Sequence, residues 1–335
     1  MRILLLSNMY PSRERPDYGV FVQRLAEALR ARGHELDEAV LESGTRGRLR
    51  TPLAYLRLLR RARRLVRRHR PDVVYAHYLV PTGLVAMAAG APFVITAHGQ
   101  DVANVGTVPL VGGLTRRVVS RAAAVICVSE YLALRLPGHP RRIEVIDCGV
   151  DTATYASSPR AEGEGEGPRY LVVASLTERK NLGRLMEAFG RLGSGTLTVA
   201  GAGPLEAELR AAAPERVTFL GRVEPGRMPE LYRECDVYCQ PSLVEPQGQA
   251  LLEALASGRP VVATRVGGPP EYVTDACGVL VDPLDVAAIA EGMRAAAELP
   301  VPCPAAAEVA QRHSIARSAE LVEQLLVEVT SGGDG

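Results

Sequence analysis

The strongest constraint on the fold is an alternation of short apolar runs with amphipathic stretches, which occurs twice along this chain. In the first half, the runs typical of buried strands are Arg2–Asn8, Leu36–Leu41, Asp72–His77, Pro92–His98, Ala124–Ser129 and Ile143–Cys148. Helical spacing lies between them, at 19–32, 52–70, 80–90, 112–123 and 130–136. Strands separated by helices form βαβ units with right-handed crossovers, so residues 1–155 predict a doubly wound α/β domain with a parallel sheet.

The same rhythm starts again after residues 156–168, where Gly, Glu and Pro without apolar periodicity indicate a linker. The second set of strands is expected at Tyr170–Leu176, Thr196–Ala200, Val217–Leu220, Asp236–Gln240, Pro260–Thr264 and Gly278–Val281. Helices fit 181–192, 204–213, 226–234, 248–257 and 285–298. We therefore expect a second doubly wound domain over 169–303 and a helical tail, 304–335, that returns to the first domain. Two such domains in tandem would place the carboxyl ends of both sheets around a central cleft.

Charge is divided unevenly between the two halves. Residues 1–150 hold 23 Arg and 12 acidic residues, a net charge of +11, and the remainder carries −10. Residues 46–70 contain eleven of these arginines and no acid. Two interpretations stay open: a solvated helix that rests its apolar stripe on the sheet, or a helix that docks on an anionic membrane beside a lipid-linked acceptor. Nucleic acid is a poorer fit, because the chain has no Trp and only four Phe.

The lengths of the apolar runs and the spacing of the cysteines favour the cytoplasm. No apolar run reaches the roughly 20 residues that span a bilayer, and the first apolar run is too short for a signal peptide. The six cysteines form no C-x-x-C pair and are expected to be buried thiols in a reducing compartment. We expect a cytoplasmic protein, at most peripheral at the inner face of the membrane.

The segment with the most specific pattern is E-P-Q-G-Q-A-L-L-E-A-L-A-S-G, residues 245–258. Gly248 would open a helix whose free N–H groups and positive dipole end can meet a phosphate. Glu245 before that helix and Glu253 within it would each accept hydrogen bonds from hydroxyls, as a nucleotide sugar requires on either side of its diphosphate. The alternative is two solvated carboxylates. Lys180, the only lysine among 39 basic residues, is a candidate for a site that needs a compact ammonium, with chance survival as the alternative.

The segment resembles the signature of the retaining GT-B glycosyltransferases of family 4, E-P-x-G-x-x-x-x-E-A-x-A-x-G-x-P-V-V-A-x-x-x-G-G-x-x-E, which runs unbroken to Glu271. The stretch Ala174–Asn181 is similar to the family's strand, loop and helix that carries a lysine. Thr96–Asp101 is similar to its H-G-x-D motif. The resemblance covers nearly the whole chain and implies two Rossmann-like domains that face a central cleft.

The resemblance also implies roles for particular residues. Lys180 would pair with the donor diphosphate, Glu245 would bind hydroxyls of the transferred sugar, and Glu253 would bind the ribose. His98 would reach the donor sugar. The alternatives are that it acts as a general base, or that it is a core or loop histidine without a catalytic role. The further residues expected to bind the donor are Gly19, Asp101, Ser175, Arg179, Gly201, Gly203, Val223, Gly248, Gln249 and Ala250.

Three positions depart from the family pattern. Ser175 stands where the family has a phosphate-binding arginine, and whether Arg179 replaces it is open. Gln247 replaces a common Phe, and the Gly-Gly of the first loop is reduced to Tyr18-Gly19.

No D-x-D pair marks a metal site, so the resemblance implies a metal-independent transfer from a UDP- or GDP-linked sugar. The acceptor would be a glycan, a lipid-linked or a small-molecule hydroxyl. A sugar-nucleotide epimerase and a catalytically silent binding subunit of the same fold are the alternatives.

Overall fold

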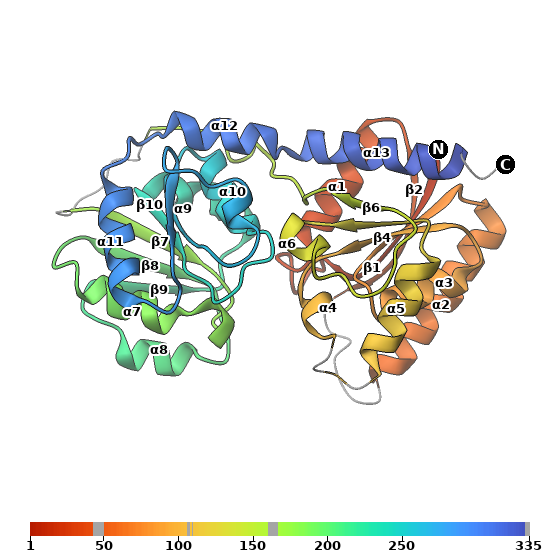
Figure 1. Ribbon diagram of the computed structural model, residues 1–335, viewed down its shortest axis with the longest axis horizontal. Coiled ribbons are helices and arrows are strands. Elements are labelled where there is room, and N and C mark those ends of the chain that lie inside the picture. Colours follow the sequence, from red (N-terminus) through yellow and green to blue (C-terminus); the bar gives the residue numbers. More distant parts are fainter. Residues whose placement is uncertain (43–49, 106–107, 109, 160–166, 332–335) are drawn as a thin grey trace. The chain divides into compact units, whose positions relative to one another are not determined.

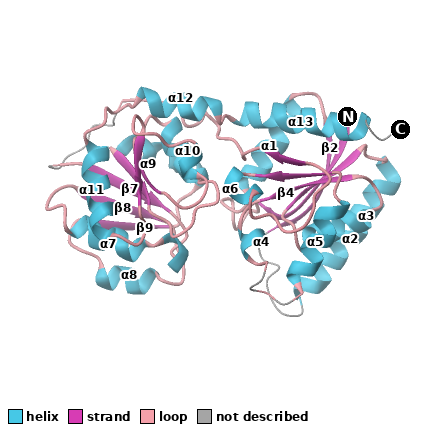
Figure 2. Ribbon diagram, in the orientation of Figure 1, coloured by secondary structure: helices cyan, strands magenta, loops and turns pink. Residues whose placement is uncertain are grey.

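The computed structural model describes residues 1–42, 50–105, 108, 110–159 and 167–331. Contacts divide the chain into two compact units: Met1–Gly149 together with the C-terminal segment from Ile315, and Val150–Ser314. Each unit holds one six-stranded sheet, and every strand pair in both sheets is parallel. Helices cover both faces of each sheet (Figures 1 and 2). The expected α/β class with two Rossmann-like domains is confirmed.

The first sheet has the order β2-β1-β3-β4-β5-β6. Its strands are β1 (Arg2–Tyr10), β2 (Glu35–Glu42), β3 (Val73–His77), β4 (Phe93–Ala97), β5 (Ala124–Cys127) and β6 (Ile143–Val145). One face packs against α2 (Arg50–His69), α3 (Thr82–Ala89) and α5 (Val111–Arg121), and the other against α1 (Val20–Ala31) and α13 (Ile315–Ser331). Two single-turn helices, α4 (Gln100–Ala103) and α6 (Glu130–Ala133), follow β4 and β5.

The second sheet has the order β12-β11-β10-β7-β8-β9. Its strands are β7 (Arg169–Val173), β8 (Thr196–Ala200), β9 (Val217–Gly221), β10 (Val237–Gln240), β11 (Val261–Thr264) and β12 (Gly278–Val281). One face packs against α7 (Leu182–Gly190), α8 (Glu206–Ala212) and α11 (Val286–Ala297). The other packs against α9 (Met228–Glu234), α10 (Gln249–Ala256) and α12 (Pro304–Arg312). Three short 3₁₀ helices lie in its loops, at Glu178–Lys180, Pro225–Arg227 and Pro269–Glu271.

The strand order of each sheet reverses at one point, and ligands of doubly wound folds bind at the carboxyl ends of the strands beside that point. In the first sheet the reversal lies between β1 and β3, and in the second between β7 and β10. Residues that follow β7 and β10 in the chain are therefore brought together, although tens of residues separate them in the sequence.

The boundaries differ from the sequence expectation at two places. The first unit ends at Gly149 rather than at 155, and the tail does not start as one helix at 304. Instead α12 belongs to the second unit, the helix is interrupted at His313–Ser314, and α13 packs on α1 of the first unit. The interruption is where Val150 pairs with Ser314 as an isolated β-bridge and donates its N–H to the His313 carbonyl, at 2.8 Å. Residues 160–166 of the expected linker, and 43–49 before α2, lie outside the described residues.

All six cysteines are free and buried, as expected from their spacing. Over the described part of the chain, no helix combines the length and the apolar character needed to cross a membrane.

Candidate functional site

The loops that follow β7 and β10 are tied together at the reversal point of the second sheet. Leu243 donates its backbone N–H to the Arg179 carbonyl at 2.9 Å. The Asn181 side chain is buried and donates to the carbonyls of Pro241 at 2.9 Å and Pro283 at 2.6 Å. Asn181 has a φ of +58°, a conformation that Asn tolerates better than most residues. These contacts bring the only lysine of the chain beside the segment after β10.

Lys180 forms an ion pair with Glu245 in this loop cluster. Its Nζ donates to Glu245 Oε2 at 2.6 Å, and the two side chains are 14% and 9% exposed. Gln240 and Ser242 donate to the same oxygen, Ser242 at 3.1 Å. Every hydrogen bond recorded for this carboxylate among the described residues goes to Oε2. Oε1 is therefore the oxygen left to accept from a ligand.

The charge state of Glu245 follows from these neighbours. Burial raises the pKa of its carboxyl, but the Lys180 charge and the hydrogen bonds from Lys180 and Gln240 together lower the pKa below its ordinary value. The nearby charge of Arg179 acts in the same direction, although the Arg179 side chain is itself exposed. Glu245 is thus an anion at neutral pH and acts as a hydrogen-bond acceptor only.

Backbone contacts explain why the signature continues to the glycine pair after β11. Glu245 pairs with Gly267 as an isolated β-bridge, and its carbonyl accepts the Gly268 N–H at 2.9 Å. A Cβ on Gly267 would lie 1.9 Å from the Glu245 carbonyl oxygen, and the φ of +123° at Gly267 also disfavours other residues. The glycine pair therefore fixes the backbone that carries Glu245.

Helix α10 starts immediately after this loop, at Gly248, without a side-chain cap. Its first turn, which includes Gln249 and Ala250, thus presents the N–H groups and the positive dipole end that suit a phosphate. Glu253 lies one turn further on and is partly buried. The hydroxyl of Tyr232, from α9, lies 3.0 Å from Glu253 Oε2.

The two glycines after β8 shape the loop after β7. A Cβ on Gly201 would lie 1.8 Å from the Ala174 carbonyl oxygen, and one on Gly203 would lie 2.4 Å from the Leu176 carbonyl oxygen. Their absence of side chains lets the two loops lie against each other. Ser175 is exposed on the surface of that loop, and Val223 packs partly buried against the core on the α9 and α10 face.

In the first unit, Asp101 holds loops rather than presenting a free carboxylate. It is buried and accepts the backbone N–H groups of Gly99 at 2.8 Å, Leu79 at 3.1 Å, His98 at 3.1 Å and Val102 at 3.1 Å. Burial raises the pKa of Asp101, and these backbone hydrogen bonds oppose that shift. The H-G-x-D segment is thereby fixed to the loop after β3.

His98 has both ring nitrogens engaged within the first unit. Its Nε2 lies 3.0 Å from His77 Nδ1, and its Nδ1 lies 3.6 Å from Cys148 Sγ. Burial and the neighbouring His77 lower the pKa of His98 well below its ordinary value, so the ring is neutral at pH 7. A neutral imidazole with both nitrogens engaged is a weak general base. Gly19 lies buried at the start of α1, against the end of β1.

Sequence reasoning missed the polar residues behind the site. Gln240, Ser242 and Tyr232 contact Glu245 or Glu253, and His77 and Cys148 contact His98. One signal was available: Gln240 ends an otherwise apolar strand, Val237–Gln240, in which every residue is buried. Among the described residues, no group of three His, Cys, Asp or Glu side chains is arranged to hold a metal ion.

Known families match both units of the chain. The description "Glycosyltransferase Family 4" matches residues 19–154, and "Glycosyl transferases group 1" matches residues 167–298. The chain is 32% identical over 260 residues to the GDP-mannose-dependent alpha-(1-6)-phosphatidylinositol monomannoside mannosyltransferase of Mycolicibacterium smegmatis, which covers 68% of each protein. It is 33% identical over 251 residues to a D-inositol 3-phosphate glycosyltransferase of Mycobacterium sp. strain KMS, covering 64% of this chain and 56% of that protein.

Solved structures show the same fold at low identity. A sucrose-phosphate synthase from Thermosynechococcus elongatus has a TM-score of 0.83 and 18% identity, covering 99% of this chain and 100% of that one. Anabaena HepE in complex with UDP-glucose has a TM-score of 0.77 and 20% identity, covering 98% and 100%. Fold and relatives define a glycosyltransferase with two Rossmann-like domains. The chain belongs to glycosyltransferase family 4, and the relatives give no support to the epimerase or the silent binding subunit.

Proposed function

We propose that this enzyme transfers a sugar from a nucleoside diphosphate sugar to an acceptor hydroxyl, with retention of the anomeric configuration and without a divalent metal. The observation that carries the proposal is the largely buried Lys180–Glu245 pair, 14% and 9% exposed, at the carboxyl ends of β7 and β10, beside the uncapped start of α10. Lys180 and the start of α10 suit the diphosphate of such a donor, and the Glu245 carboxylate suits the hydroxyls of its sugar.

On donor binding, Lys180 and Glu245 would each replace their mutual contact with a contact to the donor. Lys180 would turn from Glu245 to the diphosphate. Glu245 would accept hydrogen bonds from hydroxyls of the transferred sugar, initially at Oε1. The first turn of α10, at Gln249 and Ala250, would donate to the diphosphate, and Glu253 would accept the ribose hydroxyls. Ser175 offers a hydroxyl on the same loop where the family carries an arginine, and Arg179 supplies the nearest further charge.

In this mechanism the bond between the anomeric carbon and the leaving phosphate oxygen breaks while the acceptor oxygen attacks from the same face. The acceptor's proton passes to the departing phosphate, and the charge that develops there is stabilised by Lys180 and the α10 N-terminus. We assign His98 a sugar contact rather than the role of base, because its lowered pKa leaves it a poor proton acceptor. In this proposal the sugar would take the place of His77 or Cys148 at one of the two ring nitrogens. Asp101 supports that contact by holding the loop.

Relatives supply candidates for the substrates. The M. smegmatis protein is named for GDP-mannose and a phosphatidylinositol mannoside, and the KMS-strain protein is named for inositol 3-phosphate. We propose GDP-mannose and UDP-glucose as the first donors to test, with polyol, glycan and lipid-linked acceptors. The site needs no resident cofactor in this proposal.

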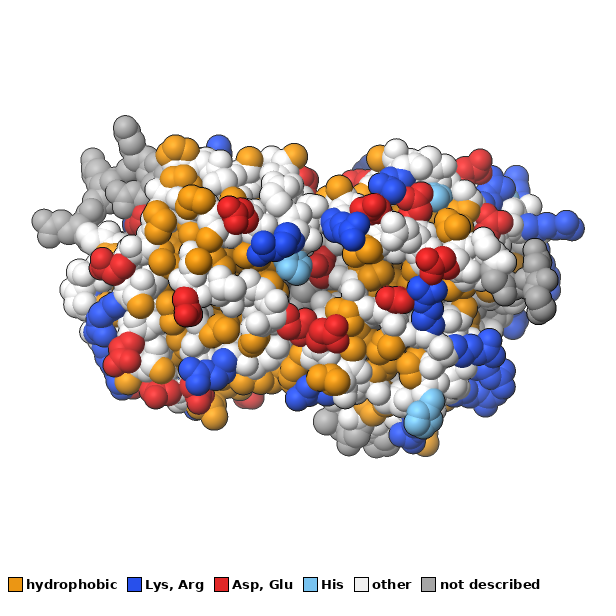
Figure 3. Space-filling model, turned by 45° about the horizontal axis from the view of Figure 1, so that its top comes forward, with side chains coloured by type: hydrophobic (Ala, Val, Ile, Leu, Met, Phe, Trp, Pro, Cys, Tyr) orange, Lys and Arg blue, Asp and Glu red, His pale blue; other side chains and the backbone are white. Residues whose placement is uncertain are grey.

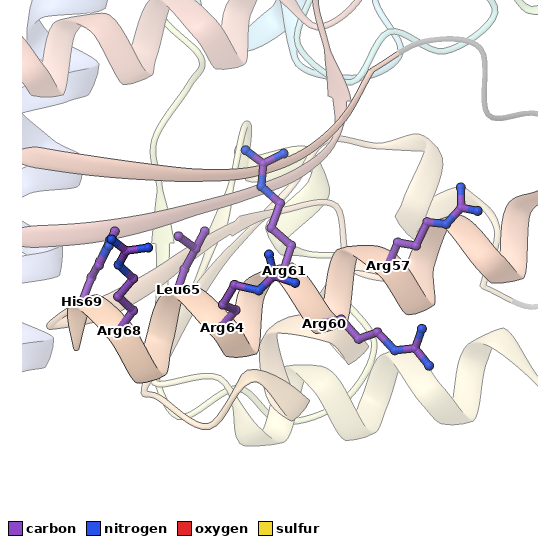
Figure 4. A pocket seen from close by; sticks show the side chains of 7 residues that line it. All are labelled: Arg57, Arg60, Arg61, Arg64, Leu65, Arg68 and His69. Atoms are coloured by element: carbon purple, nitrogen blue, oxygen red, sulfur yellow. The ribbon is translucent and has the colours of Figure 1, made fainter.

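We further propose that α2 brings the enzyme to an anionic membrane on the cytoplasmic side. Its apolar stripe is buried at Ala54, Leu58 and Ala62, which leaves the arginines outside. Seven exposed arginines of α2 have no acidic partner among the described residues, and they are Arg57, Arg60, Arg61, Arg63, Arg64, Arg67 and Arg68. Figure 4 shows arginine side chains spread along the helix. They line a surface depression of about 700 Å³.

Figure 3 shows that basic side chains gather at the right-hand end of the first unit, whereas acidic and basic ones mix on the second. An exposed helix with this charge gains about 1 kcal/mol per arginine near an anionic bilayer.

The enzymatic proposal is tested by calorimetry and product analysis. Glu253→Ala should weaken binding of the nucleoside diphosphate itself, because the ribose contact is lost. Glu245→Gln should spare that binding and slow sugar transfer. NMR of the product should show the donor's anomeric configuration. The reverse pattern of affinities, or an inverted product, would contradict the placement of the two carboxylates or the retaining course.

A further inference from the structure

Two buried tyrosines lie side by side behind the two carboxylates. Tyr232, on α9, and Tyr238, on β10, are each fully buried, with ring centroids 5.7 Å apart. Although the rings are neighbours, their hydroxyls have separate targets. Tyr232 reaches Glu253, and Tyr238 reaches Gln240, which in turn contacts Glu245.

The first hydroxyl is positioned to orient Glu253. Tyr232 Oη lies 3.0 Å from Glu253 Oε2 and 3.1 Å from the Ala250 carbonyl oxygen. A hydroxyl has one hydrogen to donate, and an ionised carboxylate is the stronger acceptor. Burial and the Glu253 charge raise the pKa of Tyr232 well above its ordinary value, so the hydroxyl keeps this hydrogen at neutral pH.

The second hydroxyl acts through an amide whose orientation the carboxylate dictates. Glu245 can only accept, so Gln240 must turn its NH₂ group toward Glu245 Oε2. Its carbonyl oxygen then faces Tyr238, whose hydroxyl lies 2.8 Å from it and 3.2 Å from the Val173 carbonyl oxygen, so the shorter contact to Gln240 takes the hydroxyl hydrogen. Tyr238 and Gln240 are two residues apart on β10, so their side chains share one face of the sheet. The order of donors, from Tyr238 through Gln240 to Glu245, is therefore fixed.

We propose that Tyr232 and Tyr238 are positioning residues for separate halves of the donor. Tyr232 holds Glu253 in place for the ribose of the nucleotide. Tyr238, through Gln240, holds Glu245 in place for the transferred sugar. This inference rests on the proposed function, because it takes the roles of the two carboxylates from it.

The opposite face of the second sheet offers a matched control. Tyr170, on β7, is also buried, and its hydroxyl donates to the Met293 carbonyl at 3.3 Å. Met293 belongs to α11 and to the core on the opposite face. Loss of the Tyr170 hydroxyl removes a buried hydrogen bond of similar kind without touching either carboxylate.

The test compares Tyr232→Phe, Tyr238→Phe and Tyr170→Phe in the full-length enzyme. Calorimetry measures the affinity for GDP and UDP and for GDP-mannose and UDP-glucose, and donor hydrolysis gives kcat and KM. Tyr232→Phe should weaken nucleoside diphosphate binding about tenfold and raise KM. Tyr238→Phe should leave that binding within about twofold, but should remove most of the extra affinity that the sugar adds and lower kcat about tenfold. Tyr170→Phe should change none of these ratios.

Unfolding temperatures of the three variants separate positioning from general destabilisation. A purely structural role would lower the unfolding temperature of each variant and weaken both halves of the donor alike, which would overturn the proposal. Unchanged GDP and UDP affinity in Tyr232→Phe would also overturn it, provided that Glu253→Ala weakens them. If Glu253→Ala itself has no effect on nucleotide affinity, the failure lies instead in the proposed function.

Discussion

Replacement of Lys180 by Ala tests the centre of the proposed mechanism. The ammonium lies 2.6 Å from a carboxylate and is 14% exposed, so its charge acts in a setting with little water to screen it. A cation in such a place typically lowers a phosphate-leaving barrier by about 2 to 4 kcal/mol, which corresponds to a loss of roughly 30- to 1000-fold in rate. The assay is the initial rate of nucleoside diphosphate release from whichever donor the parent consumes.

The same change has a second, pH-dependent consequence at Glu245. Burial raises the pKa of this carboxyl and Lys180 is the largest opposing influence, so the pKa should rise when Lys180 is removed. The parent's Glu245 has a lowered pKa and stays ionised well below neutral pH. In Lys180→Ala, protonation of Glu245 should begin at a higher pH than in the parent, so the rate should fall earlier as the pH is lowered from neutral.

Two comparison variants sharpen the result. Lys180→Arg should also be impaired, because a planar fork does not replace a compact ammonium at a close phosphate. Arg191→Ala removes a cation from an exposed pair with Glu187 in the same unit and should leave the rate unchanged. Lys180→Ala activity within about threefold of the parent, with the same pH profile, would refute the assignment of Lys180 to the leaving phosphate.

Three further predictions concern other parts of the chain. Gly201→Ala should abolish donor binding measured by calorimetry, because its Cβ would lie 1.8 Å from the Ala174 carbonyl oxygen and would push the two loops apart. Arg259→Met should lower the free energy of unfolding by about 2 to 4 kcal/mol in urea titrations, since the fully buried guanidinium donates to the Tyr232 carbonyl at 2.7 Å and the Ser158 carbonyl at 2.9 Å. The third prediction concerns a variant in which four arginines of α2 are replaced by Glu, namely Arg60, Arg63, Arg64 and Arg67. This variant should no longer co-sediment with anionic vesicles, and its unfolding temperature should not fall. Equal pelleting of the parent with neutral vesicles would count against a membrane role for α2.

The sequence was sufficient to locate the strands because each buried parallel strand is a short apolar run between turn residues. All twelve expected strands overlap strands of the structure. The break at His313–Ser314 was not predictable, because the helical spacing continues through it and a pairing with Val150 interrupts the helix. The single-turn helix after β4, Gln100–Ala103, is also too short to leave a periodic signal.

For the candidate site, the sequence predicted a set of residues but not their contacts. Lys180 and Glu245 are 65 positions apart, and only the strand order brings them to one point. The engagement of both His98 nitrogens depends on His77 and Cys148. His98 follows β4, whereas His77 is the last residue of β3 and Cys148 follows β6. Side-chain contacts across strands have no local signature, so these partners were absent from the sequence prediction.

The opposite charges of Lys180 and Glu245 compensate each other within the candidate site. If a simple anion such as inorganic phosphate bound the Lys180 ammonium, Glu245 would remain buried without its cation, which is unfavourable in free energy. Under the proposed function, a complete nucleotide sugar would replace the lost cation with hydrogen bonds from its hydroxyls to Glu245, so the pair would discriminate against partial ligands. The nucleoside diphosphate that remains after the transfer has lost the sugar hydroxyls that would donate to Glu245. In the proposed mechanism, reformation of the ion pair would compete with the product for Lys180, so that Glu245 would help to displace the leaving group at the end of each turnover.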